Sequence, residues 1–254
     1  MTDQAQLPAT PARMPWRAAT VASMMRETPS AATLYFDVDD WPGHRAGQHI
    51  DVRLTAEDGY QAQRSYSIAS APEDAQLAIT VEALPDGEVS SYLVGELRVG
   101  DKLELRGPIG GYFVWEADRT EPLLLVAGGS GMVPVMSMIR HRHAAGATVP
   151  TKLLLSSRAW EDVIYRDELE RLALASDGFE VIQTLTRMPP DGWTGYTRRV
   201  DAAMLSDVGW SASAMPASFV CGPTPFVEAV ASALVLLGHA PPTIKTERFG
   251  PTGG

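Results

Sequence analysis

One stretch decides the fold of the second half of this 254-residue chain: Leu123-Leu124-Leu125-Val126-Ala127-Gly128-Gly129-Ser130-Gly131-Met132-Val133-Pro134. Its first five residues form an uninterrupted apolar run, which is typical of a strand buried on both faces of a parallel sheet. The glycines permit a sharp turn, and Pro134 suits the first turn of a helix. A strand, a glycine turn and a helix start together favour the binding of a dinucleotide pyrophosphate at the helix N-terminus.

The candidate phosphate contacts in this turn are Gly129, Ser130, Gly131 and Met132. The spacing of the glycines is not G-x-G-x-x-G, the fingerprint of many dehydrogenases. Taken alone, the segment therefore leaves a second interpretation open, an ordinary glycine-rich turn between a strand and a helix.

Strand-like and helix-like segments alternate from this stretch onward. The expected strands cover residues 123–127, 152–155, 179–185, 219–221 and 244–249. The expected helices cover residues 134–145, 165–175 and 225–237, and a glycine follows each of them closely. This alternation predicts a doubly wound parallel sheet, which we assign to an α/β nucleotide-binding domain over residues 118–254.

The first half of the chain has a different sequence pattern. Short β-like runs, at residues 31–38, 49–54, 77–81 and 102–105, are separated by turn signals such as Asp58-Gly59. This pattern is typical of a small antiparallel barrel, here expected over residues 14–117. Residues 1–13 are rich in Pro, Ala and polar groups, which predicts a disordered tail.

Composition narrows the class of protein. The formal net charge of −10 argues against general binding to nucleic acid or to anionic membranes. The single cysteine, Cys221, excludes an internal disulfide and a cysteine-bound iron–sulfur cluster within the chain. Because no apolar run is long enough to cross a bilayer and the first residues carry no apolar signal core, we expect a soluble, cytoplasmic protein.

A second motif, Arg64-Ser65-Tyr66-Ser67, lies in the first half. It offers a cation, an aromatic ring and small hydroxyls on adjacent residues, a combination that suits a flavin. Taken alone, Tyr66 would more readily be a core or edge aromatic of the barrel. The residues on either side of it favour the flavin interpretation.

The end of the second expected strand bears on nucleotide choice. In doubly wound folds a residue at this position contacts the adenine ribose, and an acidic residue there favours a nucleotide with a free 2′-hydroxyl. The chain has Ser157 and Arg158 instead, with Arg166 at the start of the next helix. Arginine pairs well with a phosphate dianion, so the sequence favours NADPH over NADH. The alternative is that these arginines are surface charges that pair with acidic residues at positions 161, 162 or 167.

Together these motifs resemble the ferredoxin–NADP reductase superfamily, in its short bacterial form without a fused iron–sulfur domain. The resemblance runs from about residue 14 to the C-terminus. It rests on segments in the expected order at residues 47–48, 64–67, 87–93, 107–110, 128–131, 221–223 and 247–249. It implies a six-stranded flavin-binding barrel followed by the nucleotide-binding domain, with FAD as cofactor and NADPH or NADH as hydride donor.

The resemblance also implies roles for residues of the barrel. Arg64 corresponds to an arginine that meets the flavin pyrophosphate, and Tyr66 to a tyrosine that packs on the isoalloxazine. Ser67 corresponds to a hydroxyl near flavin N5. Gly87, Val89 and Ser90 correspond to a segment that closes around the FAD phosphates.

Further roles fall near the C-terminus. Cys221 resembles a cysteine beside the nicotinamide, although a small buried hydrophobe is the plainer interpretation. Gly222 and Pro223 would let the backbone pass close to the nicotinamide. Glu247 would orient that ring or relay a proton, and Phe249 would cover the other flavin face. Phe249 departs from the plant-type Tyr and is followed by five more residues, so an edge-strand Phe is the alternative.

No metal site is expected. In His141-x-His143 the two residues point to different sides of a helix, so we expect surface or helix-end histidines. Met132, Met136 and Met138 in the same helix suggest core packing.

The sequence therefore predicts an FAD-dependent NAD(P)H oxidoreductase that passes electrons to a separate acceptor, most simply an iron–sulfur protein. Attraction of an acidic ferredoxin would need a local basic patch, for which the arginines of the first half are candidates, at positions 13, 17, 26, 45, 53 and 64. Two alternatives stay open: a reductase of a free flavin, quinone, haem protein or other small acceptor, and a non-catalytic flavin- or nucleotide-binding module.

Overall fold

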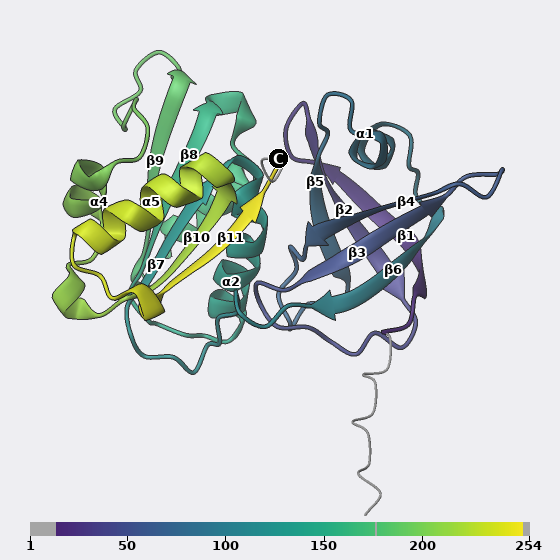
Figure 1. Cartoon of the computed structure of the whole chain (residues 1–254), viewed down its shortest axis with the longest axis horizontal. Coiled ribbons are helices and arrows are strands. Elements are labelled where there is room, and N and C mark those ends of the chain that lie inside the picture. Colours follow the sequence, from purple (N-terminus) through teal and green to yellow (C-terminus); the bar gives the residue numbers. More distant parts are fainter. Residues whose placement is uncertain (1–13, 176, 251–254) are drawn as a thin grey trace, which may run out of the picture.

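The computed structural model describes residues 14–175 and 177–250. Two β-sheets account for the two halves of the chain, and they lie side by side with α2 (Met132–Ala144) between them (Figure 1). The tail predicted over residues 1–13 lies outside the described residues, as does Arg13 of the candidate basic patch.

The first sheet is an antiparallel barrel. Within the described residues it has six strands in the order β4-β3-β6-β1-β2-β5. A bridge between Ile68 and Ile79 joins the end of β4 to β5, which closes the sheet on itself. The barrel predicted from the sequence is thereby confirmed. Its strands are β1 (Arg17–Arg26), β2 (Ala31–Val38), β3 (His49–Thr55), β4 (Gln61–Ser67), β5 (Leu77–Glu82) and β6 (Lys102–Ile109).

Large apolar side chains fill the barrel. Phe36, Ile50 and Leu105 are buried there, and the short helix α1 (Glu88–Gly95) adds Leu93 to the same core. This helix was not predicted from the sequence. It is only eight residues long and so shows too little periodicity to be told from a loop.

The second sheet is parallel in every described pair, with the order β11-β10-β7-β8-β9. Residues of the central strand alternate between two cores: Leu123 and Leu125 face the side of α2, whereas Leu124 faces the side of α5 (Thr224–Leu236). Helices therefore cover both faces, and the predicted doubly wound fold is confirmed. The strands are β7 (Leu123–Gly128), β8 (Thr151–Ala159), β9 (Phe179–Met188), β10 (Ala217–Pro223) and β11 (Ile244–Phe249).

The predicted boundaries in this half are close to the observed ones, with α2 beginning two residues earlier than expected and β8 and β9 running on toward the carboxyl edge. The short helix α4 (Ala202–Val208) was not predicted. Asp201 caps α4 by accepting a hydrogen bond from the amide of Met204 at 2.8 Å, a local signal that the sequence carried. The remaining elements are α3 (Arg166–Ala173) and the short 3-10 turns η1 (Gly129–Gly131), η2 (Trp160–Asp162), η3 (Ala212–Ala214) and η4 (Pro241–Thr243).

The two halves share one buried junction. Phe113 and Trp115, which follow the barrel, are buried in the same cluster as Met136 and Met138 of α2. The hydroxyl of Ser137 in α2 also donates a hydrogen bond to the carbonyl oxygen of Ser70, at 2.7 Å. Helix α2 therefore packs on its own sheet and on the barrel at once, and the expected core role of its methionines is confirmed.

The start of α2 tolerates no side chain at Gly131. A Cβ there would lie 2.3 Å from the carbonyl oxygen of Cys221 and 2.8 Å from the amide nitrogen of Gly222, both main-chain atoms. We expect Gly131→Ala to destabilise the protein by ~1–3 kcal/mol, because two packed backbones must move apart. Denaturant unfolding measures this loss. Gly111→Ala is the control, since a Cβ there meets nothing within 4 Å; equal midpoints for the two variants would contradict the packing argument.

Candidate functional site

The candidate site lies where β4 of the barrel meets the carboxyl ends of β10 and β11. The hydroxyl of Ser67, the last residue of β4, donates a hydrogen bond to Oε1 of Glu247 at 3.3 Å. These residues are 180 positions apart in the chain. Residues that the sequence analysis proposed from two separate motifs are thus in contact across the junction.

Strand register brings the C-terminal motif residues together. Cys221 is the pairing neighbour of Glu247 in the adjacent parallel strand, and Pro223 is the neighbour of Phe249. Cys221 is 1% exposed, and its burial, with a smaller effect from Glu247, raises the pKa of its thiol well above the usual value. A neutral, buried thiol is a poor nucleophile, so Cys221 can serve as a small apolar wall of the site.

Glu247 is the titratable group of this site. Burial raises the pKa of its carboxyl group to about 7, against the opposing effect of the hydrogen bond from Ser67. A carboxyl group with such a pKa exchanges a proton readily at neutral pH. The site therefore contains a group that can hold or release a proton at the junction of the two halves.

Phe249 ends β11 and is 36% exposed. Its neighbour Arg248 turns away to α5, where it binds Glu228 with its Nε at 2.8 Å. Among the described residues the ring of Phe249 is thus partly exposed, and its predicted place over the flavin stays a prediction.

The glycine turn has the shape that a phosphate needs. Gly129 adopts a positive φ of 55°, and a Cβ there would meet nothing within 4 Å. Ser130 is half-buried beside it, at the start of α2. Met132 is fully buried in the junction core, so only its main chain can contribute to a binding site. Open space over the glycine turn and a helix N-terminus fit a dinucleotide pyrophosphate.

The flavin motif is divided between ligand-facing and structural side chains. The side chain of Arg64 is exposed, and its hydrogen bond within the described residues is the one that it donates to the neighbouring carbonyl oxygen of Gln63, at 2.6 Å. Ser65 instead donates to the buried carboxylate of Asp51 at 2.6 Å. Tyr66 is half-buried, and burial raises the pKa of its phenol to about 12, so it stays neutral. Arg64 and Tyr66 thus remain available for a flavin and its pyrophosphate, while Ser65 anchors the strand.

The segment before α1 would use main-chain atoms to hold a phosphate. The Ser90 hydroxyl donates to the carbonyl oxygen of Gly87 and accepts from the amide of Leu84, both at 3.2 Å. Val89 is buried in the barrel core. The first amides of α1 have no partner within the helix. An FAD phosphate at this position would therefore meet those amides, with Ser90 shaping the loop.

The predicted ribose-phosphate residues are only partly accessible. Ser157 is buried near the end of β8, whereas Arg158 is exposed. Arg166 pairs with Asp167, with 3.3 Å between Nε and Oδ1, and lies over the ring of Trp160 at 5.2 Å. For Arg166 the alternative interpretation, a surface charge paired with an acidic neighbour, describes the observed contact.

Two histidines of α2 were expected at the surface or at a helix end. Both lie in its last turn, so the helix-end expectation is confirmed, and His141 is buried there, with 8% of its surface exposed. Its Nδ1 contacts Glu73 at 2.7 Å and its Nε2 accepts the amide of Ala117 at 3.2 Å. In the described ranges no group of three or more His, Cys, Asp or Glu side chains is placed to hold a metal ion.

Sequence reasoning missed several residues that position the site. Asp51, which anchors Ser65, is itself held by Arg106 with 2.6 Å between Nη2 and Oδ2. Arg140 and Tyr165 join the halves on the other side of α2. Such partners are distant in the chain, so no local motif marks them.

Among the helices of residues 14–175 and 177–250, none is long and apolar enough to cross a membrane.

Comparisons with known proteins agree with this geometry. The family model of the oxidoreductase FAD-binding domain matches residues 19–114, and that of the oxidoreductase NAD-binding domain matches residues 125–232. NADH-cytochrome b5 reductase 1 of Aspergillus terreus is 34% identical over 211 residues, which cover 79% of this chain and 70% of that protein.

A second relative and a solved structure extend the comparison. The ferredoxin–NAD(P)(+) reductase component of naphthalene 1,2-dioxygenase/salicylate 5-hydroxylase systems, from a Ralstonia species, is 30% identical and matches 82% of this chain but 61% of its own length. The flavohem-like FAD/NAD binding domain of nitric oxide dioxygenase from Vibrio cholerae superposes with a TM-score of 0.82 at 23% identity, covering 92% of this chain and 99% of that one.

A flavin-binding barrel joined to a doubly wound nicotinamide-nucleotide domain defines a flavin-dependent oxidoreductase. The chain belongs to the ferredoxin–NADP reductase superfamily, as its motifs predicted.

The raised pKa of Glu247 predicts a pH-dependent stability difference. In the unfolded chain the carboxyl group ionises near pH 4.5, whereas in the flavin-free folded protein it stays protonated up to about 7. Relative to Glu247→Gln, the wild type should therefore lose ~3 kcal/mol of unfolding free energy as the pH rises through this interval, with no further change above it. Urea unfolding over a pH series measures the difference. Glu96→Gln, at an exposed position, is the control; a flat difference for Glu247→Gln would contradict the prediction.

Proposed function

We propose that this protein oxidises NADH, transfers the hydride to N5 of a bound FAD, and passes the electrons to a separate iron–sulfur protein. The observation that carries the proposal is the hydrogen bond from Ser67 to Glu247, which joins the flavin motif to the nicotinamide motif in one site. Bound FAD would supply the redox chemistry, because it accepts a hydride and releases electrons one at a time.

The chain's own residues would bind and orient both rings. Tyr66 and Phe249 offer aromatic surfaces at the ends of β4 and β11. Cys221 and the main chain after it would form a close, apolar floor that excludes water. Ser67 holds its proton toward Glu247, which fixes the direction of its hydroxyl. Glu247, with its pKa near neutrality, would keep or release a proton at Oε1 as the charge nearby changes.

The choice of NADH replaces the NADPH preference that the sequence predicted. Two arginines were proposed to bind a 2′-phosphate. Arg166 already pairs with Asp167, so Arg158 is the one that could still bind this phosphate. A relative is named for its use of NADH. A single exposed arginine contributes less to phosphate binding than a buried, two-arginine clamp does.

The choice of an iron–sulfur acceptor rests on the chain's composition and on one relative. The single cysteine cannot bind a cysteine-ligated cluster, so these 254 residues offer no iron–sulfur acceptor of their own. The Ralstonia relative is named as a ferredoxin–NAD(P)(+) reductase component. Of the candidate basic patch, Arg45 pairs with Glu116, and Arg53 pairs with Glu104 at 2.6 Å, whereas Arg64 is exposed. Arg26 is exposed as well, and it donates to the carbonyl oxygen of Val94 at 3.2 Å. Electrostatic attraction of an acidic partner would therefore depend mainly on Arg26 and Arg64.

The donor is tested by anaerobic titration of the flavin-loaded protein with each nucleotide. NADH should bleach the flavin at lower concentration than NADPH. Arg158→Ala should raise half-saturation by NADPH about threefold to tenfold, the loss of one charge-assisted hydrogen bond, and leave NADH unchanged. Arg98→Ala, an exposed arginine of the barrel, is the control. Bleaching by NADPH at the lower concentration would overturn the choice of NADH, and a flavin bleached by neither nucleotide would overturn the proposed reaction.

The role of Ser67 is tested by single-turnover reduction. Ser67→Ala removes the hydroxyl that contacts Glu247 and should slow flavin reduction by NADH about tenfold to a hundredfold, equivalent to ~1.4–2.7 kcal/mol of transition-state stabilisation. The FAD content of the purified variant is the control for simple loss of cofactor. An unchanged reduction rate would remove Ser67 from the mechanism.

The acceptor is tested separately, by steady-state oxidation of NADH. Reduction of an added ferredoxin that is faster than reduction of a free flavin, a quinone or cytochrome b5 supports the proposal. A faster rate with a small acceptor, or with the cytochrome, would replace the iron–sulfur partner. Cytochrome b5 is the second candidate acceptor, because the Aspergillus relative is named as a cytochrome b5 reductase.

A further inference from the structure

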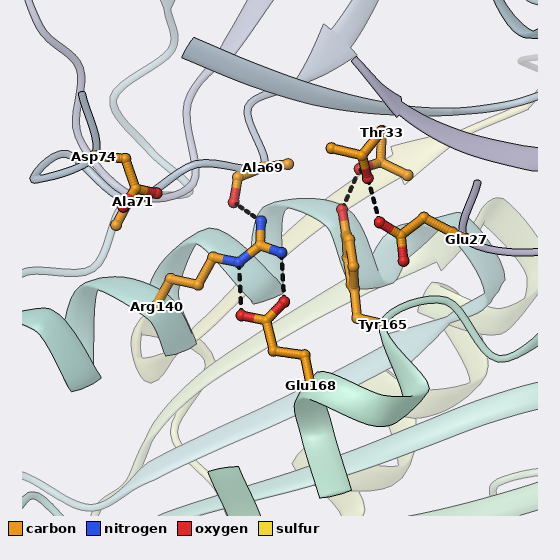
Figure 2. Close-up of polar contacts among 9 residues, drawn as sticks. Glu27, Thr33, Ala69, Ala71, Asp74, Arg140, Tyr165 and Glu168 are labelled. Carbon is orange, nitrogen blue, oxygen red and sulfur yellow. Dashed lines mark hydrogen bonds and ion pairs between the residues drawn. The ribbon is translucent and has the colours of Figure 1, made fainter. Parts of the chain in front are cut away.

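A second set of contacts joins the two halves, away from Ser67 and Glu247. It involves α2 and the start of α3 on one side, and β2, β5 and the segment after β4 on the other (Figure 2). We call this set the junction latch. Its members are Glu27, Thr33, Ala69 and Thr80 of the barrel half and Arg140, Tyr165 and Glu168 of the nucleotide half.

The first part of the junction latch is a chain of hydroxyl groups. Thr33 donates to Oε1 of Glu27 at 2.5 Å and lies 2.7 Å from the hydroxyl of Thr80, to which Tyr165 donates in turn. Each hydroxyl has one proton. Because Thr33 uses its proton on Glu27, it accepts from Thr80, and Thr80 accepts from Tyr165. The three hydroxyls therefore point one way, from the nucleotide half to a barrel carboxylate.

The second part is an arginine fork. Arg140 binds both oxygens of Glu168, at 3.0 and 2.6 Å, and donates its remaining terminal nitrogen to the carbonyl oxygen of Ala69 at 2.8 Å. Its guanidinium also lies over the ring of Tyr165, 4.8 Å from the centroid. Ala69 is two residues beyond Ser67 in the chain. The fork thus ties α2 and α3 to the main chain next to the flavin motif.

Tyr165 connects this junction to the predicted nucleotide site. It precedes α3 and follows the end of β8, where Ser157 and Arg158 lie. Its side chain is 3% exposed, and its backbone is left-handed with φ of 60°, a conformation that is strained for an aromatic residue. A residue held in this way fixes the path of the chain from the adenosine end of the nucleotide site to the barrel.

We propose that Tyr165 is a positioning residue that acts through the junction latch. Because of Tyr165, binding of the adenosine end of the dinucleotide determines where the nicotinamide meets the flavin. This inference rests on the proposed function, since it concerns the same hydride donor. The adenosine end does not react, but its binding energy can be used to align the reacting end. A donor that lacks the adenosine end cannot gain from the latch.

The test compares two donors in the flavin-loaded protein, NADH and reduced nicotinamide mononucleotide, which lacks the adenosine end. In Tyr165→Phe, flavin reduction by NADH should slow about fivefold, the effect of one hydrogen bond, while reduction by the mononucleotide stays the same. Thr80→Val removes the acceptor of that bond and also the bond from Thr80 to Thr33, so it should slow reduction by NADH at least as much. The double variant should lose no more than Thr80→Val alone. Tyr60→Phe, which removes an exposed hydroxyl bonded to Glu88 within the barrel, is the matched control.

A readout other than activity uses the single thiol. Cys221 is buried at the junction, so its labelling rate with a thiol reagent reports opening of the two halves. The rate should rise about fivefold in Tyr165→Phe and at least as much in Thr80→Val, but not in Tyr60→Phe.

The outcomes separate the two proposals. Equal slowing with both donors, or no slowing with either, would overturn the positioning role. If NADH failed to reduce the flavin of the wild type, the proposed function would be wrong. Thiol labelling would still test the junction latch: faster labelling of Tyr165→Phe than of the wild type supports it, and an unchanged rate overturns it.

Discussion

The packing of α2 against two sheets at once is the constraint on which the site depends. Gly131, just before its first residue, lies against the main chain of β10 and leaves no room for a Cβ. Later turns of α2 bind the barrel half through Ser137 and His141. A helix is stiff over this length. The predicted phosphate site at the start of α2 and the strand with the predicted flavin motif are therefore held in one relation, although their sequences are far apart.

Several polar groups at this junction have defined partners across it. A hydrogen bond between Ser67 and Glu247 in a largely apolar surrounding is stronger than it would be in water, and it is sensitive to the protonation of the carboxyl group. Cys221, between these residues and the core, adds bulk without charge. The site thus combines one proton-exchanging group with apolar walls, which is an arrangement suited to a reaction that moves a hydride and excludes water.

Much of the fold was predictable from local signals. The apolar run and glycine turn at residues 123–131 predicted the central strand and the start of α2, because parallel strands and helix N-termini have strong composition signatures. The motif at residues 64–67 and the pair at 247 and 249 marked both sides of the site. Recognition of the family added the order of these motifs, which no single segment carried.

Other features could not be read from the sequence. The burial of His141 depends on Glu73 and on Ala117, which only the folded chain brings near it. The pairing of Arg166 with Asp167 was one of two interpretations that adjacent charges allow. Ser65 and Ser67 stand two residues apart in one strand, yet one anchors to Asp51 and the other reaches Glu247. Such differences arise from tertiary contacts, which local patterns do not encode.

The strand order β11-β10-β7-β8-β9 has a consequence for how the protein is made. A ribosome releases β7, β8 and β9 in succession, and these can pair as they emerge. The other edge of β7 must wait for β10, which is translated much later. Until then the most apolar strand of the sheet has an open edge, and such an edge is a template for pairing with other chains. The nascent polypeptide is thus most exposed to misassembly between the synthesis of β9 and that of β10, and slow translation of the intervening segment would lengthen that interval.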